Sequence, residues 1–360
     1  MFWLLLACAP DGWSEKELRT LKSLSPVPAA PASPGNSVAD RAEAADLGRQ
    51  IFFDPKFSAD GNVSCSTCHM PDRAFADGQK VASVPRGVGT RNVPSVEGAA
   101  WNTWFFWDGR ADSAWAQATG PLLNPIEHAA TPELVRQRVV EQYAEPFTAL
   151  FGGISEDPMR VLAQVGKVVE AYERTLAPGP SRFDRYVAAL PTETEILTAQ
   201  EREGLRLFIG DAGCINCHNG PLFTDRSFHN IGLPYTGDGG RVFGASQALA
   251  NPMNCEGAYS ESTDCPELRY LDPAFADWPA AFKTPGLRNV SRTAPYMHDG
   301  SMADLQQVLL FYNQLPGEVR VGHRELTLVP LRFQSEDLVA IEAFLKSLES
   351  EVAPGSGTGS

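Results

Sequence analysis

The sequence predicts a mainly α-helical protein that consists of two related domains with long loops. Three observations lead to this prediction. The motif Cys-X-X-Cys-His occurs twice, at 65–69 and at 214–218. Before each copy stands a short stretch with helical apolar spacing, at 42–53 and at 204–209, followed by a turn rich in Gly and Asp. The length of 360 residues allows a hydrophobic core around each motif. The repeated order indicates that the two halves arose by duplication.

Each motif has the pattern of a covalent attachment site for haem c. Two thiols three positions apart can form thioethers with the two vinyl groups of one porphyrin, and the histidine that follows supplies an axial ligand to the iron. A single Cys-X-X-Cys is also compatible with half of a zinc site or a redox-active pair, but two complete copies that both end in histidine favour haem. We therefore expect two cytochrome c-like domains and two covalently bound haem c groups. The attaching residues are Cys65, Cys68 and His69 for the first haem and Cys214, Cys217 and His218 for the second.

The composition limits the kinds of partner. The net charge is −14, with 43% hydrophobic and 21% charged residues. Because a negatively charged chain is repelled by nucleic acid and by anionic lipid, we expect neither as a partner. Beyond the N-terminus, no stretch of the sequence is long and apolar enough to span a membrane.

The N-terminus has the features of a shortened export signal. Residues 2–7 form an apolar run that ends at Cys8 and resembles a bacterial lipobox, although no Lys or Arg precedes it. We expect Cys8 to be lipidated, so that the protein contacts a membrane only through a lipid anchor. A buried N-terminal strand is the alternative. Because bacterial haem c attachment takes place outside the cytoplasm, we expect a periplasmic protein.

Composition also suggests the domain boundaries. We expect residues 1–8 to be a lipoprotein-like signal remnant, 9–38 a disordered Pro/Ala/Ser-rich tether, 39–178 the domain of the first haem, 179–350 the domain of the second haem, and 351–360 a flexible tail. Cys255 and Cys265 lie in a loop-like stretch, where a disulfide contributes about 3 kcal/mol in the chain-entropy model. Two free thiols are the alternative.

The first haem lacks an evident second axial ligand. No histidine occurs between His69 and His128. An open coordination position suits a haem that activates peroxide, whereas an electron carrier normally fills it.

Further along, Glu127 stands next to Pro125 and Ile126, an apolar setting that raises a carboxyl pKa and suits a general acid or base. Four tryptophans precede it, namely Trp101, Trp104, Trp107 and Trp115. Such residues mostly pack in a core, but one between two porphyrins can relay electrons.

Several stretches resemble, in order, the bacterial dihaem cytochrome c peroxidase superfamily over residues 40–350. They are RNVPS (91–95), FWDGRADS (106–113), GP (120–121) and GLRNVSRTAPYMHDGS (286–301). The resemblance implies that Trp107 lies between the haems and that Gln117, Pro121 and Glu127 form the peroxide pocket. It also implies one calcium ion between the domains, bound by the Asn92 side chain and the carbonyls of Thr293 and Pro295. Oxygen ligands of this kind suit calcium.

Three positions depart from the pattern of many members. A histidine that blocks the first iron in those proteins is replaced by Pro85 and its neighbours, so we expect no reductive activation. His128 stands where many relatives have methionine. Tyr312 stands where they have the axial methionine of the second haem, which resembles the MauG/MbnH-like subgroup. An anionic tyrosinate ligand favours high-valent iron. Met297 and Met302 are competing ligands.

The predicted function is that of a dihaem peroxidase. In this prediction, hydrogen peroxide generates a high-valent dihaem state that oxidises a residue of a partner protein. One alternative is a cytochrome c peroxidase that receives electrons from a small cytochrome or a cupredoxin. The other is a non-catalytic dihaem electron-transfer protein, in which both irons have six ligands.

Overall fold

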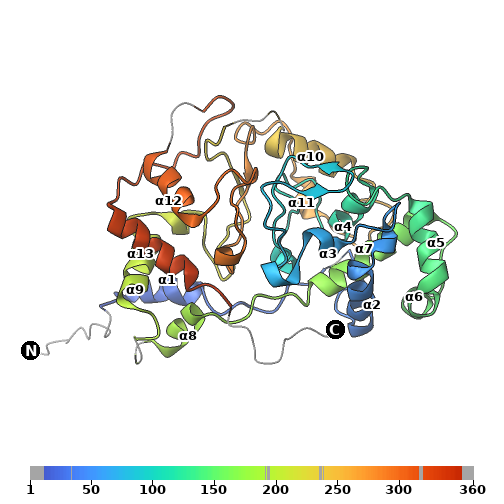
Figure 1. Cartoon of the computed structure of the whole chain (residues 1–360), viewed down its shortest axis with the longest axis horizontal. Coiled ribbons are helices and arrows are strands. Elements are labelled where there is room, and N and C mark those ends of the chain that lie inside the picture. The colour runs from blue at the N-terminus through green and yellow to red at the C-terminus, as the bar shows by residue number, and fades with distance from the viewer. Residues whose placement is uncertain are drawn as a thin grey trace, which may run out of the picture.

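The computed structural model describes residues 12–33, 35–190, 192, 195–234, 237, 239–315 and 319–350. The fold is mainly helical, as predicted, and Figure 1 shows two bodies side by side. The described strands form two antiparallel pairs: β1 (Ser83–Val84) with β2 (Gly87–Val88), and β3 (Phe228–His229) with β4 (Phe282–Lys283). Short 3-10 helices occur at η1 (Pro55–Phe57), η2 (Pro71–Arg73), η3 (Ala99–Trp101), η4 (Cys214–Asn216) and η5 (Val290–Arg292).

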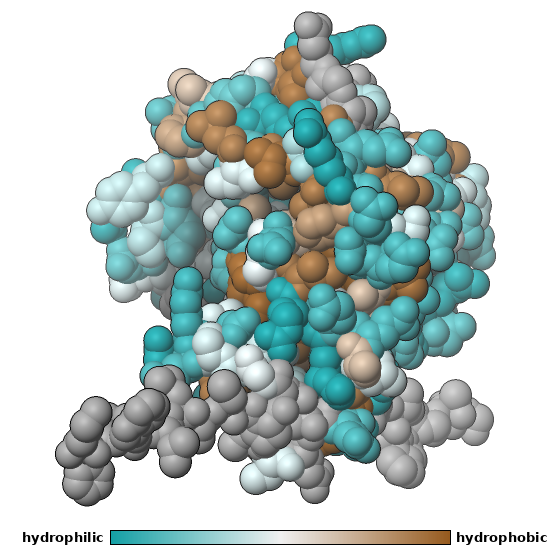
Figure 2. Space-filling view, turned by 90° about the vertical axis from the view of Figure 1, so that its left-hand side faces the viewer, coloured by the Kyte–Doolittle hydropathy of each residue, from teal (hydrophilic) through white to brown (hydrophobic). Residues whose placement is uncertain are grey.

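The left-hand body in Figure 1 surrounds the second Cys-X-X-Cys-His motif. Its helices are α1 (Glu15–Ser23), α8 (Arg182–Ala189), α9 (Ala199–Ile209), α12 (Leu305–Gln314) and α13 (Ser335–Lys346). Phe183, Phe208, Phe223 and Phe344 meet edge to face in its core. Figure 2 shows this end of the molecule, where brown apolar residues lie among teal polar ones. Along the described chain, no helix has both the length and the apolar composition needed to cross a bilayer.

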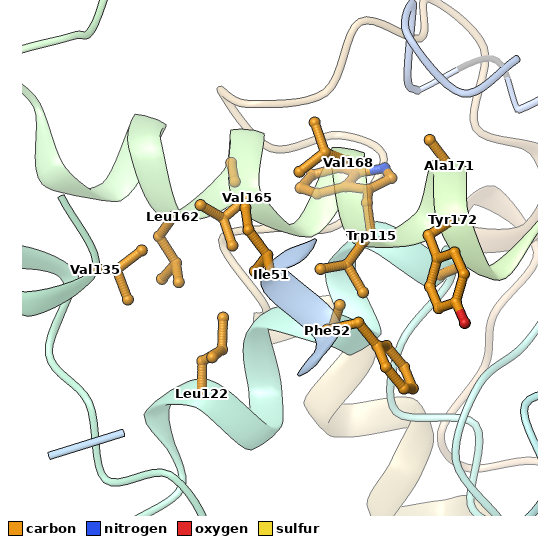
Figure 3. Close-up of a cluster of buried hydrophobic side chains, with 14 of the residues drawn as sticks. Ile51, Phe52, Trp115, Leu122, Val135, Leu162, Val165, Val168, Ala171 and Tyr172 are labelled. Atoms are coloured by element: carbon orange, nitrogen blue, oxygen red, sulfur yellow. The ribbon is translucent and has the colours of Figure 1, made fainter. Parts of the chain in front are cut away.

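The right-hand body surrounds the first motif. Its helices are α2 (Ala42–Phe53), α3 (Cys65–Cys68), α4 (Ala114–Leu123), α5 (Pro132–Gln142), α6 (Ala144–Phe151) and α7 (Pro158–Glu173). Helix α7 lies at the centre, and its residues from Val161 to Glu173 are almost all buried. In Figure 3, Val165 and Val168 of α7 lie close to Ile51 of α2 and Trp115 of α4. This packing holds α2 and α4 around α3, which carries the first motif.

The stretch expected to be a disordered tether is largely ordered. Helix α1 begins at a capping box between Ser14 and Glu17, and Leu21 and Leu24 are fully buried in the left-hand core. The indole Nε1 of Trp13 donates a hydrogen bond to the Tyr186 hydroxyl (2.6 Å). The prediction of a free tether is therefore wrong for residues 12–33 and 35–38. Apolar residues at helical spacing precede the Pro/Ala-rich run and supply the burial that orders it.

The signal remnant around Cys8 and the tail at 351–360 lie outside the described residues. Neither the lipidation of Cys8 nor the flexibility of the tail is tested here by the structure.

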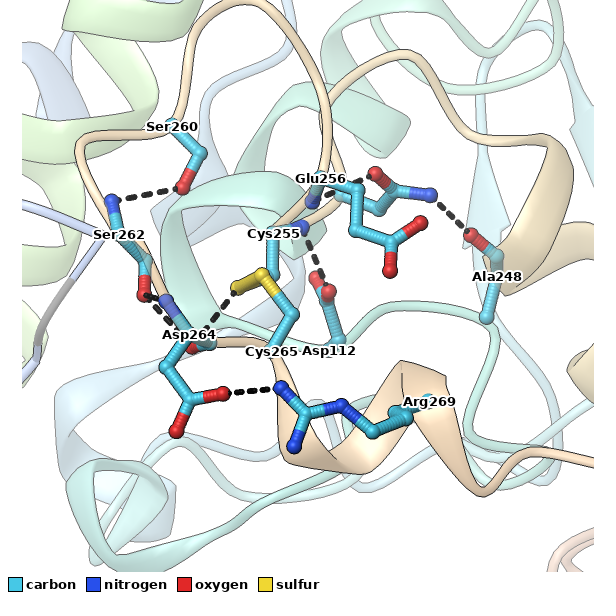
Figure 4. The surroundings of a disulfide bond; sticks show 10 residues. Asp112, Ala248, Cys255, Glu256, Ser260, Ser262, Asp264, Cys265 and Arg269 are labelled. Carbon is cyan, nitrogen blue, oxygen red and sulfur yellow. Dashed lines mark hydrogen bonds and ion pairs between the residues drawn. A yellow bond between two sulfur atoms is a disulfide. The ribbon is translucent and has the colours of Figure 1, made fainter.

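A segment of the second half packs on the first half. Helices α10 (Gly240–Ala250) and α11 (Pro266–Arg269) lie beside α4 in Figure 1. Cys255 and Cys265 form a disulfide with a Cα–Cα distance of 5.7 Å, and the backbone N–H of Cys255 donates to Asp112 (2.7 Å; Figure 4). Lys167 of α7 pairs with Glu261 of the same loop (2.7 Å). The disulfide loop thus holds α10 and α11 against the right-hand body.

Candidate active site

The two Cys-X-X-Cys-His motifs share one local geometry that fits haem c. The Nδ1 atom of His69 is 3.0 Å from the carbonyl oxygen of Phe75, and that of His218 is 3.0 Å from the carbonyl oxygen of Phe223. Each ring therefore donates from Nδ1, and Nε2 is the atom that would bind an iron, as in many metal-binding histidines. The four cysteines are half-buried and form no disulfide. The residues that haem c requires are present and oriented at both motifs.

Helix α4 positions the predicted peroxide residues of the first motif. Gln117 and Pro121 are four positions apart and so share one face of the helix. The chain then turns back, because the N–H of Glu127 donates to the Asn124 carbonyl (3.0 Å) and that of His128 to the Pro121 carbonyl (3.3 Å). The turn brings Glu127 beside the last turn of α4.

The Glu127 carboxyl group is held in an environment that favours its proton. Burial raises its pKa, although the amide of Asn124 donates to Oε1 (2.5 Å) and Arg110 lies near. The charge of Glu127 in turn raises the pKa of the Cys68 thiol, in addition to the effect of burial. The carboxyl group is thus close to the first attachment motif, where a proton-transferring group is needed.

The loop that carries a blocking histidine in many relatives is fixed next to Glu127. Arg86, between β1 and β2, donates from Nη1 to the carbonyl oxygens of Glu127 (2.9 Å) and His128 (3.1 Å). Its Nη2 pairs with Asp60 (2.8 Å). His128 is buried, and burial lowers its pKa to about 4, so its ring is neutral at neutral pH. The arginine therefore anchors the hairpin to the backbone of the pocket.

Trp107 lies at the junction of the two bodies. Its Nε1 donates to the Asn92 carbonyl (2.9 Å), and its own carbonyl accepts from the N–H of Lys283 in β4 (2.8 Å). The next residue, Asp108, is buried and pairs with Arg91 (2.9 Å) and Arg110 (3.1 Å). Residues from both halves of the chain therefore position the tryptophan.

Tyr312, on α12, reaches the second attachment motif. Burial raises the pKa of its hydroxyl, and the charges of Cys214 and Cys217 raise it further, which places the phenol beside these cysteines. A phenol oxygen near this motif is chemically able to bind an iron held by His218.

Comparison with known proteins identifies the family. The family model for di-haem cytochrome c peroxidases matches residues 42–190. Over 315 residues, the chain is 36% identical to the methylamine utilization protein MauG of Methylorubrum extorquens, covering 85% of this chain and 78% of that protein. The chain belongs to the dihaem cytochrome c peroxidase family. It is therefore a haem peroxidase that acts on hydrogen peroxide, and the family carries two c-type haems.

Other similar proteins include both peroxidases and MauG-like proteins. The cytochrome c551 peroxidase of Nitrosomonas europaea is 30% identical over 322 residues, covering 87% of this chain and 81% of that protein. A MauG-like protein associated with microbial copper homeostasis has a TM-score of 0.69 at 28% identity, covering 91% of this chain and 97% of that one. The diheme peroxidase BthA from Burkholderia thailandensis has a TM-score of 0.72 at 26% identity, covering 91% and 89%. The similarity alone does not separate the two activities.

The residues expected to bind calcium in this dihaem peroxidase lie in two segments that meet. The backbone N–H of Asn92 donates to the carbonyl of His298 (2.9 Å), three residues after Pro295. The Asn92 side-chain nitrogen donates to the Gln79 carbonyl (2.9 Å), and the oxygen of this amide is the atom able to bind a cation. Thr293 and Pro295 are half-buried in the second segment. This arrangement is compatible with calcium, which stays a prediction.

Sequence reasoning missed the polar residues that hold the pocket together. Arg86, Asn124 and Arg241 received no role. Arg86 and Asn124 both contact Glu127, and Arg241 contacts Gly109, two residues after Trp107. Asn124 stands three residues before Glu127, a spacing that favours a turn bond. Arg241 follows a Gly-rich stretch far along the chain, and no local pattern connects it to Trp107.

Proposed function

We propose that this dihaem peroxidase has a MauG/MbnH-like activity, in which hydrogen peroxide provides the oxidising equivalents for modifying a residue of a partner protein. The observation that carries the proposal is Tyr312, whose phenol lies near enough to Cys214 and Cys217 for their charges to raise its pKa. In this proposal, Tyr312 and His218 would together hold the iron of the second haem. The haems, when bound, supply the electrons that reduce peroxide and store the resulting oxidising equivalents.

In the first pocket, the geometry of α4 and its turn supports the proposed roles. Glu127 accepts a proton from peroxide at one carboxylate oxygen and returns it to the departing oxygen, while Asn124 holds its other oxygen in place. Gln117 donates an amide hydrogen bond that orients the peroxide. Pro121, on the same helical face, contributes an apolar wall without an N–H group. We expect no histidine side chain to block this pocket. The resting protein should therefore react with peroxide without prior reduction.

Trp107 is proposed to be the link between the haems. Hydrogen bonds at its indole nitrogen and its carbonyl oxygen fix it from two segments, one from each half of the chain. A fixed ring needs little reorganisation when an electron is removed from it, which favours transfer. Asn92 makes one of these contacts, so the proposed calcium ion would stabilise the Trp107 position as well as the junction.

The proposed ligand role of Tyr312 requires loss of its proton. Burial raises the pKa of the phenol, so the anionic form must be stabilised by a nearby positive charge. A ferric ion provides such a charge and lowers the pKa of groups bound to it. A methionine ligand would give no such anionic site, and this difference separates the proposed activity from that of an ordinary cytochrome c peroxidase.

The partner is proposed to be a protein met in the periplasm, and the haem c attachment motifs support this location. A lipid anchor at Cys8 remains part of the proposal.

The electron paramagnetic resonance spectrum of the resting ferric protein tests the assignment of the two haem sites. We expect one high-spin iron at the open first site and one low-spin iron at the second. A methionine-type second haem and rapid turnover with a small cytochrome or cupredoxin would instead indicate an ordinary peroxidase. Two low-spin irons that do not react with peroxide would indicate an electron carrier.

A further inference from the structure

Arg241 is a buried cation that contacts the turn following Trp107. It lies in the first turn of α10 and is 1% exposed. Its Nη1 donates to the carbonyl oxygens of Asp108 (3.2 Å) and Gly109 (2.6 Å). Gly109 has φ +70° and a Cβ there would collide with this guanidinium, which explains why glycine is needed. The arginine thus occupies a fixed place behind the tryptophan loop.

Three aromatic rings surround the same guanidinium group. Its central carbon is 4.0 Å from the ring centroid of Phe228, 4.1 Å from that of Trp104 and 4.9 Å from that of Trp278. Trp104 is three residues before Trp107 and buried, whereas Trp278 is half-buried and packs against the exposed Phe275. Trp104 and Trp278 are therefore two oxidisable rings on one guanidinium group, and Trp278 is partly exposed at the surface.

The charge of Arg241 decides whether these rings can be oxidised. Burial lowers its pKa to about 10, so the group stays positive at neutral pH, and Asp108 favours the charged form. A cation over a ring face is attracted by the electrons of the ring. Removing an electron from that ring places a second positive charge close to the first, in a poorly solvated site where repulsion is strong. Oxidation of Trp104 or Trp278 is therefore opposed.

We propose that Arg241 is a positioning and protecting residue that keeps oxidising equivalents on Trp107 and the haems and away from Trp104 and Trp278. This inference rests on the proposed function, because it takes Trp107 as the link between the haems. Without such protection, a tryptophan loses two electrons and two protons and gains one oxygen from water. The two electrons reduce one hydrogen peroxide with two protons to two waters, so the net change is one tryptophan and one peroxide giving hydroxytryptophan and water.

The test compares two variants of the haem-loaded protein that differ in charge. Arg241→Lys keeps a cation and Arg241→Gln keeps an amide donor without the charge. Each protein receives successive equivalents of hydrogen peroxide without a partner, and peptide mass spectrometry measures the oxygen added to Trp104 and Trp278. We expect little addition in the wild type and in Arg241→Lys, and about tenfold or more addition in Arg241→Gln. Trp278→Phe in the Arg241→Gln background should remove the signal at position 278.

Equal addition in Arg241→Lys and Arg241→Gln, or no addition in Arg241→Gln, would overturn the inference. If Arg241→Gln does not fold, the wild-type protein under excess peroxide provides the test. The inference then requires that Trp104 and Trp278 stay unmodified while another Trp or Tyr is modified. Early modification of Trp278 in the wild type would contradict the protecting role. The visible spectrum of the same samples tests the proposed function separately. If peroxide leaves the spectrum of one haem unchanged in the wild type, the proposed function is wrong, regardless of the peptide data.

Discussion

The indole nitrogen of Trp107 donates a hydrogen bond to the carbonyl oxygen of Asn92 at 2.9 Å. The backbone N–H of Asn92 in turn donates to the carbonyl of His298, in the other half of the chain. One residue therefore connects the proposed inter-haem tryptophan, the proposed calcium site and the contact between the two bodies. A change at Asn92 is expected to act on all three.

Removal of calcium is predicted to weaken the coupling of the two haems. Without a cation between Asn92 and the carbonyls of Thr293 and Pro295, this junction is expected to loosen and Trp107 to lose its fixed orientation. Chelation should therefore make the two haem potentials independent of each other in a redox titration, and added calcium should restore their coupling. Asn92→Ala should behave like the chelated protein and not respond further to chelator. A wild type that is unaffected by chelation would contradict the calcium site.

Replacement of Glu127 by Gln is predicted to slow the reaction with peroxide about 10²–10⁴-fold, because the group that moves the proton is lost. In the wild type, burial raises the pKa of Glu127, so its basic form is lost as the pH falls through a value above the usual 4.5. The rate should fall over that range, and Glu127→Gln should remove this dependence. Stopped-flow absorbance at several pH values measures both effects. Glu133→Gln, on the exposed side of α5, is the control and should react like the wild type.

Replacement of Trp107 by Phe is predicted to separate the two haems without closing the first pocket. Phenylalanine is much harder to oxidise than tryptophan and cannot donate to the Asn92 carbonyl. Peroxide should still react at the first haem, while the spectrum of the second haem stays unchanged. Trp101→Phe, a nearby buried tryptophan, serves as the matched variant. If Trp107→Phe oxidises both haems at the wild-type rate, the linking role is excluded.

His128 is predicted to destabilise the fold in acid. Its pKa is lowered from 6.5 to about 4 by burial, so between these values the unfolded chain binds a proton that the native protein does not. Stability should therefore fall by about 3 kcal/mol as the pH decreases from 6.5 to 4. His128→Asn can still donate to the Phe57 carbonyl and should lose less stability over this range. Denaturant unfolding at both pH values, followed by circular dichroism, provides the comparison.

The haem attachment residues and the order of the helices around them could be predicted from the sequence because their signals are local. Two copies of the motif Cys-X-X-Cys-His, each preceded by a helix, are enough to predict a duplicated helical fold. Gln117 was found only through the family resemblance, whereas the apolar neighbours of Glu127 suggested a general acid or base before the resemblance placed it in the pocket. The proximity of Glu127 to Cys68 depends on the turn at Asn124, which folds the chain back on α4.

Long-range packing could not be predicted in the same way. Helix α1 buries Leu21 and Leu24 against residues more than a hundred and fifty positions away, so composition alone suggested a tether. The disulfide loop and α10 pack on the first half for a similar reason, since Arg241 finds its partners only in the fold. In each case the decisive contact joins residues that are distant in the sequence, and such a contact cannot be predicted from the pattern of a short stretch.

The most direct test of the account is the Mössbauer spectrum after one equivalent of hydrogen peroxide, in the wild type and in Tyr312→Met. With Tyr312 as the ligand of the second iron, we expect both irons of the wild type to leave the ferric state together, and in Tyr312→Met only the first iron to do so. A wild-type spectrum in which the second iron stays ferric, or in which Tyr312→Met behaves like the wild type, would contradict the proposed two-haem oxidant.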